Sequence, residues 1–390
     1  MKVLFIGSVV GKNRQDDVIK NSKTTFEFSA NVVQEKLLSA FRNLCNDFQV
    51  VSAAGIGSFP NAYKKAYFKG FKGKDEKISY VKFNNIWGIR NISRAKAIKR
   101  EIKRFVNDKS QDKIIVIYSV HTPFLSALEY AKKKDCTIKT LMIVPDLPQY
   151  MNLSKKKSLL YRIGKKYDIK KFNSLNKYVD SYMLLTESMK ELLPMQGKPY
   201  FVCEGIVEDK EFGSLQKNKA HEKCVVYTGK MSSVFGVVNL VKAFKLIEDK
   251  EYRLNLIGAG EDYEEIKKLS ADDDRITVFG QVPASTAKEW INKAGVLVNP
   301  RLNDEEYTKY SFPSKTIEYL MSGNKVVAYK LDGMKEDYIK FLTVPEDHSI
   351  EALKNAIVSG KKGESFIPYA KENLKATSVC EKIIALALGK

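Results

Sequence analysis

The sequence that decides the fold is VVYTGKMSSVFGVVNLVKAF, which runs from Val225 to Phe244. It opens with a short apolar run rich in β-branched and aromatic residues, the composition of a buried strand. Gly229 and Gly236 then bracket a loop, and the apolar residues that follow have helical spacing. A strand that passes through a glycine-bounded loop into a helix indicates an alternating α/β architecture.

The same alternation continues on both sides of this stretch. Downstream, the short apolar runs are YRLNLIG, ITVFG, GVLVNP and KVVAY; upstream, they are KVLFIG, QVVSAA, KIIVIYSV, IKTLMIVP and SYMLLT. Segments with helical spacing lie between the runs, at residues 31–45, 92–106, 122–134, 237–247, 263–269, 285–293 and 313–322. Strands that alternate with helices predict parallel, doubly wound sheets.

A chain of 390 residues is too long for one ordinary core, and two Rossmann-like domains would account for it. We expect an N-terminal domain over residues 1–206 and a C-terminal domain over residues 207–369, with the linker in the charged segment 207–222. The last segment, 370–390, is expected to form a helix that packs back onto the N-terminal domain. Ligands of doubly wound sheets bind at the carboxyl ends of the strands, so we expect two domains facing across a cleft, with one ligand on each side.

Composition excludes several classes of protein. No apolar run reaches the roughly 18 residues of a membrane span, and MKVLFIGSVV is interpreted as a first strand rather than a signal peptide. The five cysteines include no CxxC pair, which argues against a disulfide framework or a zinc site and favours the cytoplasm. The net charge is +20: residues 1–205 contain 38 Lys and Arg against 18 Asp and Glu, whereas residues 206–390 contain 28 of each. The first half is therefore expected to face an anionic partner.

Glycines and a lysine follow the strands of the second half. Lys230 stands in a loop whose backbone N–H groups we expect to face phosphate. The glycines after the next two strands are expected to form a wall beside a bound base. An ordinary strand-to-helix turn is the alternative for each loop. The candidate donor-binding residues of these loops are Gly229, Lys230, Gly258, Gly260, Gly280 and Gln281.

The stretch SFPSKTIEYL, residues 311–320, predicts a helix whose first turn leaves its backbone amides free. Pro313 suits that turn because its missing N–H would be unpaired there, and Ser311 or Ser314 can cap it. The amides of Phe312, Ser314 and Lys315, with the Lys315 ammonium, would face an anion. Glu318 lies one turn further on, where its natural partner is a ribose diol. A solvent-facing glutamate is the alternative.

Together, YTGKM…FG, LIGAGE, FGQVP, VNPR and SFPSKTIEYLMSGNKVV resemble the donor domain of the retaining glycosyltransferases of family 4, which have the GT-B fold. The resemblance covers about 110 residues. It implies that a nucleotide-diphosphate sugar binds mostly to the second domain, with the basic residue matching Lys230 on the diphosphate and the acid matching Glu318 on the ribose. It also places the turn matching Ser311, Phe312 and Pro313 against the sugar and phosphate.

Two positions depart from the family pattern. Phe235 stands where a second cation often precedes the glycine matching Gly236, and Tyr310 stands where a glutamate usually lies near the transferred sugar. The acidic loop at residues 304–306 could substitute for that glutamate, or it could be an ordinary exposed loop. The departures also leave room for a catalytically silent relative.

In the first half, polar residues follow three strands. His121 comes after KIIVIYS, where it could bond an acceptor hydroxyl or take its proton, and the resemblance implies a histidine near the donor sugar. Asp146 comes after the next strand and is a candidate acceptor contact. Gly11, after the first strand, would let the backbone approach the donor phosphates. Glu187 is a weaker candidate of the same kind.

The surplus of cations is concentrated at residues 63–74 and 155–172, where lysines alternate with aromatic and aliphatic residues. This combination favours an anionic membrane surface. A merely basic surface is the alternative, and nucleic acid is not expected because no nucleic-acid-binding motif accompanies the charge.

These features and the resemblance predict a glycosyltransferase that extends a glycan or lipid-linked acceptor for a surface polysaccharide, at the inner face of the cell membrane. Retention of configuration is implied by the resemblance, and a UDP-sugar is the commonest donor to expect. His121, Lys230 and Glu318 are the expected catalytic residues, and neither a cofactor nor a metal is expected. Two alternatives stay open: a degenerate GT-B partner subunit that binds nucleotide-sugar or glycan, and a GT-B-like sugar-nucleotide epimerase.

Overall fold

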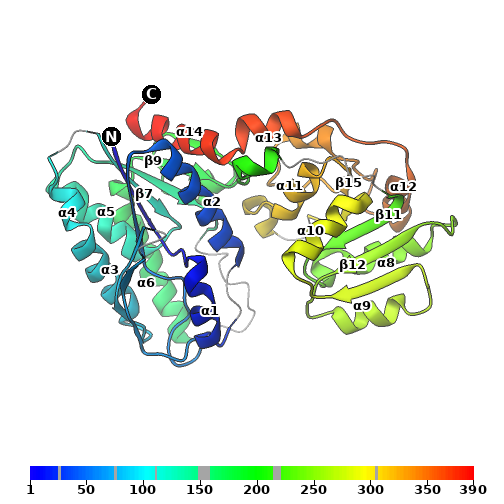
Figure 1. The fold of residues 1–390 in the computed structure, drawn as a ribbon, viewed down its shortest axis with the longest axis horizontal. Helices are drawn as coiled ribbons and strands as arrows, with labels where there is room; N and C mark the ends of the chain where they lie inside the picture. The colour runs from blue at the N-terminus through cyan, green and yellow to red at the C-terminus, as the bar shows by residue number, and fades with distance from the viewer. Residues whose placement is uncertain (25–27, 74–76, 110–111, 148–158, 214–220, 304–305) are drawn as a thin grey trace. The chain divides into compact units, whose positions relative to one another are not determined.

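The computed structural model describes residues 1–24, 28–73, 77–109, 112–147, 159–213, 221–303 and 306–390. The chain forms two compact units, of which the first contains Met1–Glu208 together with Leu374–Lys390 and the second contains Asp209–Asn373. Each unit is a sheet covered by helices on both faces (Figure 1).

The sheet of the first unit has the order β10-β9-β8-β7-β1-β2-β5-β4. All its neighbours pair in parallel except β4, which runs antiparallel to β5 at one edge. The strands that follow β1 in the sequence lie first on one side of it, with β2, and later on its other side, with β7 to β10. The topological switch point therefore lies between β1 and β7. The strands are β1 (Lys2–Gly7), β2 (Asp47–Ser52), β4 (Phe71–Gly73), β5 (Ile78–Tyr80), β7 (Lys113–Tyr118), β8 (Lys139–Val144), β9 (Ser181–Leu184) and β10 (Tyr200–Val202). A separate two-stranded antiparallel sheet pairs β3 (Tyr67–Phe68) with β6 (Phe83–Asn84).

Helices cover this sheet in two groups. One group contains α3, α4, α5 and α6, which contact one another, and α14 packs against α2 in the other. The helices are α1 (Lys12–Asn21), α2 (Phe28–Leu44), α3 (Arg90–Glu101), α4 (Lys103–Asn107), α5 (Thr122–Lys134), α6 (Leu159–Leu175), α7 (Met189–Leu192) and α14 (Ala376–Leu388).

The second unit has a fully parallel sheet with the order β13-β12-β11-β14-β15, so its switch point lies between β11 and β14. Helices α8, α9 and α12 pack together, while α10 and α11 contact the sheet from its other side (Figure 1). The strands are β11 (His221–Thr228), β12 (Arg253–Ile257), β13 (Ile276–Gly280), β14 (Ala294–Asn299) and β15 (Lys325–Ala328); the helices are α8 (Val237–Lys245), α9 (Tyr263–Ser270), α10 (Ala284–Lys293), α11 (Ser314–Met321), α12 (Ile350–Val358) and α13 (Ile367–Asn373).

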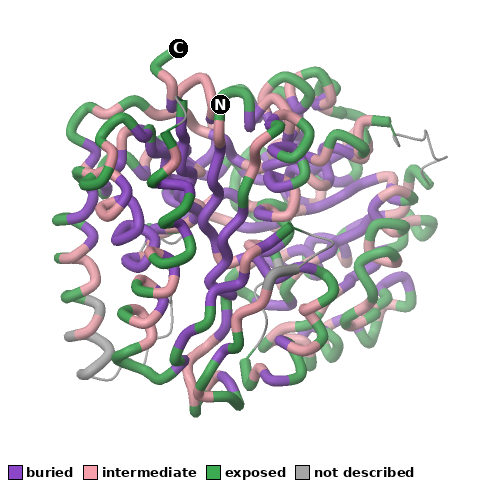
Figure 2. Tube along the Cα trace, turned by 60° about the vertical axis from the view of Figure 1, so that its left-hand side comes forward, coloured by how far each residue is buried: buried purple, intermediate pink, exposed green. Residues whose placement is uncertain are grey.

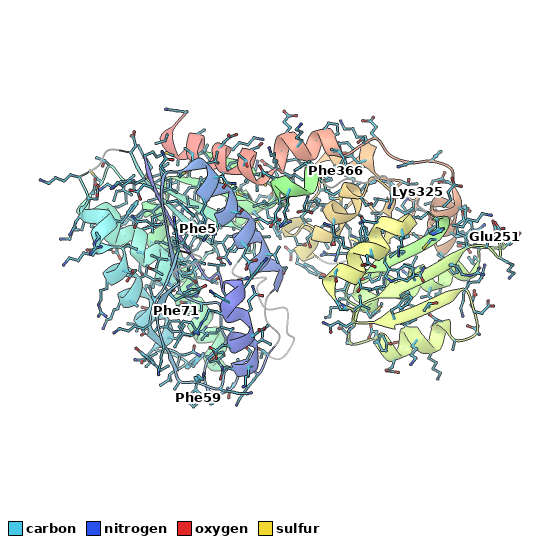
Figure 3. All side chains as sticks on the ribbon, viewed as in Figure 1. Phe5, Phe59, Phe71, Glu251, Lys325 and Phe366 are labelled. Atoms are coloured by element: carbon cyan, nitrogen blue, oxygen red, sulfur yellow. The ribbon has the colours of Figure 1, made fainter. Side chains whose placement is uncertain are left out.

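The buried parts of the chain follow the apolar runs of the sequence. Figure 2 shows the central strands as continuously buried, because both faces of a parallel sheet are covered by helices. Phe5, labelled in Figure 3, is fully buried in β1 of the first unit. Among the described residues, no helix has the length and apolar character needed to cross a membrane.

The predicted α/β class with two Rossmann-like domains is confirmed, and three local expectations were wrong. The sheets are not purely parallel, because β4 pairs antiparallel with β5. The segment 370–390 is not one helix: its first residues end α13 in the second unit, and the rest contains α14, which packs against α2 of the first unit. Helix α11 begins at Ser314, with Pro313 at the preceding N-cap position, and no side chain caps it.

Candidate functional site

The site lies at the carboxyl ends of the strands of the second unit, where consecutive loops are locked together. The amide of Gly229, after β11, donates to Ile257 O of β12 at 2.9 Å, and the amide of Gly258 donates to Gly280 O at the end of β13 at 2.8 Å. Gly258 has φ +146°, and a Cβ there would lie 1.8 Å from the Gly229 oxygen. Only glycine lets these loops approach so closely.

The β11–α8 loop is fastened further by the next loop. The amide of Met231 donates to Ala259 O at 3.0 Å, the amide of Ser233 donates to the Asp262 carboxylate at 2.6 Å, and a Cβ on Gly260 would meet Met231 O at 2.1 Å. The expectation that this loop offers a row of free N–H groups to phosphate is therefore wrong in part. The amides that already donate inside the protein are those of Gly229, Met231, Ser233, Phe235 and Gly236.

Lys230 extends from this loop and already has an acidic partner. Its ammonium lies 2.8 Å from Glu261 Oε2, and Ser232 donates to Oε1 of the same carboxylate at 2.9 Å. These contacts, the lysine first, lower the pKa of Glu261 to about 2. Both side chains of the ion pair are about half exposed, so a bound anion could compete with Glu261 for Lys230.

The Ser311–Ser314 turn is held from behind by aromatic packing. Phe312 is buried and its ring lies 5.0 Å from that of Tyr338, which in turn contacts Phe366 (labelled in Figure 3) at 5.7 Å. The Thr316 amide donates to Pro313 O at 2.9 Å, and the two amides before it, those of Ser314 and Lys315, belong to the first turn, whose amides have no acceptor within the helix. The N-terminus of α11 therefore has no side-chain cap, and the packed rings of Phe312, Tyr338 and Phe366 support the turn before it.

Helix α11 is tied to the strand ends beneath it. The Thr228 amide donates to the Tyr319 hydroxyl at 2.7 Å, the Tyr319 hydroxyl lies 3.1 Å from Thr228 O, and the Asn299 side-chain amide donates to Thr316 Oγ1 at 3.0 Å. On the outer side, Lys315 and Glu318 form an ion pair of 2.6 Å. The structure thus brings both predicted residues together, half-exposed, on the first turns of α11. Gln281 lies exposed just after Gly280.

Arg301 is a residue of this site that the sequence reasoning missed. It follows Pro300 at the end of β14, it is 7% exposed, and its Nη2 donates to Ser311 Oγ at 3.1 Å. Its guanidinium carbon lies 5.7 Å from the ring centre of Phe235, the position where the family pattern led us to look for a cation. The available signal was a lone cation directly after a strand at the switch point.

The remaining departures from the family pattern are also placed. Tyr310 is 7% exposed at the end of a 3₁₀ helix that spans Glu306–Tyr310. Asp304 and Glu305, offered as substitutes for the missing acid, lie outside the described residues.

In the first unit, His121 and Gly11 lie in the loops after β7 and β1, the two strands that flank the switch point. Ser119, two residues before this histidine, has φ +82°, a strained conformation that is enriched at functional sites. The Gly11 amide donates to the Tyr80 hydroxyl at 2.8 Å and its φ is −64°, so neither a free N–H nor a glycine-specific conformation supports the predicted phosphate approach.

The electrostatic surroundings keep the His121 imidazole neutral. Part of the residue is accessible, but Nδ1 is buried with no partner among the described residues. Burial first, and then the charges of Arg94 and Arg90, lower the pKa of His121 well below its ordinary value. Asp146 is exposed after β8, and Glu187 is engaged on the surface by Lys190 at 2.6 Å.

The first basic segment differs in part from its expected form. In residues 63–74, Tyr63 and Phe68 are buried and Phe71 stacks on Tyr80 at 4.3 Å, whereas Tyr67 is 44% exposed. In the second segment, residues 155–158 lie outside the described residues, and Tyr167 of α6 is 65% exposed. Within the described ranges, no group of three or more His, Cys, Asp and Glu side chains is placed to hold a metal ion.

Comparisons with known proteins agree with this geometry. Residues 222–359 match the family profile described as glycosyl transferases group 1. A poly(glycerol-phosphate) alpha-glucosyltransferase of Bacillus subtilis (strain 168) is 26% identical in an alignment 281 residues long that covers 65% of this chain and 40% of that protein. The chain therefore spans less than half the length of this curated relative.

Solved structures resemble the whole chain. The apo form of the lipopolysaccharide outer core galactosyltransferase WaaB has a TM-score of 0.65 at 14% identity, over 100% of this chain and 99% of that one. A variant of S. aureus TarM, solved with Fondaparinux, alpha-GlcNAc-glycerol and UDP, has a TM-score of 0.59 at 12% identity, over 99% and 100%. The chain therefore has a GT-B fold whose second unit resembles the glycosyl transferases group 1 family over residues 222–359.

Proposed function

We propose that this protein is a retaining glycosyltransferase that moves a sugar from a UDP-sugar to a hydroxyl of a glycan or lipid-linked acceptor in surface polysaccharide synthesis. The observation that carries the proposal is the convergence of four loops and the first turn of α11 at the carboxyl edge of the second sheet. Lys230, Lys315 and Glu318 extend from these elements. Names of similar proteins support the class: glucosyl and galactosyl transfer are named for two of them, and UDP is bound in a third.

In the proposed reaction, the bond between the anomeric carbon and the β-phosphate oxygen breaks, and a bond to the acceptor oxygen forms. The acceptor hydroxyl proton passes to the departing nucleoside diphosphate, which keeps the bonding electron pair. Lys230, Lys315 and the N-terminus of α11 would stabilise the negative charge on the leaving group. Because these groups supply the positive charge, the proposal includes no metal ion.

We assign the acceptor to the first unit. The neutral imidazole of His121 can accept the hydrogen bond of an acceptor hydroxyl, which a protonated ring could not do. The unit also carries the entire excess of positive charge, which suits an anionic acceptor or membrane.

An apolar surface on the first unit supports docking at the inner face of the cell membrane. Ile86, Trp87, Ile89 and Ile92 are between 43% and 57% exposed at the start of α3. Helix α6 passes beside them, because a Cβ on its Gly164 would lie 3.9 Å from Trp87. Helix α6 also carries the exposed Lys166 and Lys170, and apolar area together with cations is the combination that anionic bilayers bind. We expect binding to phosphatidylglycerol vesicles that weakens in Trp87→Ala.

Thermal unfolding with UDP-, GDP-, ADP- and dTDP-sugars tests the donor site. A ligand at 100 times its dissociation constant adds about 2.7 kcal/mol of stability, so we expect one nucleotide to stabilise the wild type and not Glu318→Gln. The matched control is Glu264→Gln, an exposed acid on α9. Stabilisation by none of the four would refute the donor site, whereas stabilisation without sugar transfer to any acceptor would favour the degenerate partner subunit.

A further inference from the structure

Arg301 is a buried cation whose charge no carboxylate of the described residues neutralises. It is 7% exposed, its Nη2 donates to the neutral Ser311 hydroxyl, and its Nε is buried without a partner. Arg275, which is 4% exposed in the same unit, forms the opposite case: its guanidinium lies 2.7 Å from Asp273 and also donates to a backbone carbonyl. Burying an unpaired charge is costly, so the environment of Arg301 is complete only when an anion binds.

The fold places this cation at the switch point of the second sheet. Arg301 follows β14, and a Cβ on Gly236 would lie 2.1 Å from the oxygen of the preceding Pro300, so the β11 and β14 loops touch. The rings of Phe235 and Tyr307 lie 5.7 and 5.0 Å from the guanidinium carbon. These rings and Ser311 fix the orientation of a planar group that matches two phosphate oxygens at once.

The other two cations of the site are already paired with carboxylates. Lys230 and Lys315 each have a carboxylate partner, Glu261 and Glu318. Most backbone donors of the β11–α8 loop are used inside the protein. An incoming diphosphate would therefore meet in Arg301 a cation that does not have to leave a carboxylate first.

We infer that Arg301 binds the diphosphate of the donor nucleotide and that Ser311 is its positioning residue. This inference rests on the proposed function and adds to it a residue outside the predicted donor set. The ligand chemistry is a diphosphate ester, recognised by a guanidinium held between two aromatic rings.

Calorimetric titration of the full chain with UDP and with inorganic pyrophosphate tests the inference. Arg301→Met removes the charge and Arg301→Lys keeps it without the planar fork. Arg253→Met is the matched control, because Arg253 is exposed at the amino end of β12, the opposite edge of the same sheet. We expect Arg301→Met to weaken UDP binding by about 10- to 100-fold, the range for a lost hydrogen bond to a charged group, with a smaller loss in Arg301→Lys and none in Arg253→Met.

A second comparison separates the diphosphate from the rest of the nucleotide. Glu318→Gln should weaken UDP binding without weakening pyrophosphate binding, because it removes no cation, whereas Arg301→Met should weaken both. Equal UDP binding by Arg301→Met and Arg253→Met would overturn the inference and leave the proposed function standing. If the wild type binds no nucleoside diphosphate, the proposed function fails and pyrophosphate binding alone tests Arg301. Pyrophosphate binding by the wild type that is lost in Arg301→Met would support the inference. Absence of pyrophosphate binding by the wild type would overturn it. If Arg301→Met does not fold, Arg301→Lys against Arg253→Met decides.

Discussion

Replacing Gly258 by alanine measures how firmly the site loops are locked. The backbone of Gly258 has φ +146°, a region almost confined to glycine, and the new Cβ would lie 1.8 Å from the Gly229 carbonyl oxygen. The conformation costs about 1–3 kcal/mol in any other residue, and the overlap with backbone costs about 1–3 kcal/mol more. We therefore expect Gly258→Ala to lower the free energy of unfolding of the second unit by about 4 kcal/mol, taking the middle of both ranges.

Two other glycines of the same unit, which also have positive φ but leave more space for a Cβ, provide controls with smaller expected losses of stability. Gly323 has φ +73° with no atom within 4 Å of a built Cβ, so Gly323→Ala should show the conformational cost alone, about 1–2 kcal/mol. Gly280 has φ +71° with the Tyr263 hydroxyl 3.4 Å away, so Gly280→Ala should resemble Gly323→Ala or be slightly worse.

The assay can follow the second unit alone. The chain has two tryptophans, Trp87 in the first unit and Trp290 in α10. Because Trp87 is 57% exposed, Trp87→Phe is a mild background in which Trp290 fluorescence reports the unfolding of the second unit. With an m-value of about 2 kcal/mol/M in urea, the midpoint should fall by about 2 M for Gly258→Ala and by less than about 1 M for the controls. A Gly258→Ala midpoint equal to that of Gly323→Ala would refute the reasoning, because it would mean that the loops separate without cost.

Three further predictions concern single contacts. Tyr319→Phe leaves the buried Thr228 amide without its acceptor and should cost about 1–3 kcal/mol in the same urea assay; an unchanged midpoint would contradict the anchoring role of α11. Glu261→Gln should tighten UDP binding at pH 7 by up to about fivefold, the contribution of an exposed ion pair, because Lys230 loses its carboxylate partner. Glu261 stays ionised until the pH falls toward its pKa of about 2, so the gain in affinity should be constant from pH 6 to 8. Weaker UDP binding by the variant in calorimetry would contradict competition between Glu261 and the ligand for Lys230. Burial and two arginines lower the pKa of the His121 imidazole, so its NMR signal, identified with His121→Gln, should not titrate between pH 6 and 8. Below pH 6.5 the unfolded chain takes up a proton that the folded ring does not, so the free energy of unfolding should fall as the pH is lowered. An NMR titration midpoint of His121 at pH 6.5 or above would contradict this prediction.

Local patterns in the sequence predicted the α/β elements well because their signals are local. Helix α5 spans Thr122–Lys134 as expected, and most strands of both sheets overlap the expected apolar runs, although β4, β5 and β10 lie in none of them. Parallel strands buried on both faces must be apolar throughout, and helices must repeat their apolar residues at helical spacing, so both are visible without knowledge of partners. Helix α1 was not foreseen, since it buries little more than Val18 and Asn21 and lacks a strong apolar stripe.

The sequence by itself determined the α/β class, and it marked the loops at Gly229, Gly258 and Gly280 and the turn that opens α11. Only the tertiary structure decided the state of the charges in those loops. Lys230 has Glu261 as its partner, Lys315 has Glu318, and Arg301 has no carboxylate among the described residues, although all three are single cations after a strand or at a helix start. Pairing and burial depend on residues distant in the chain that the fold brings together, such as Ser311 and Phe235 around Arg301. The physical reason is that a cation is set free or neutralised by its neighbours in space, which no local pattern specifies.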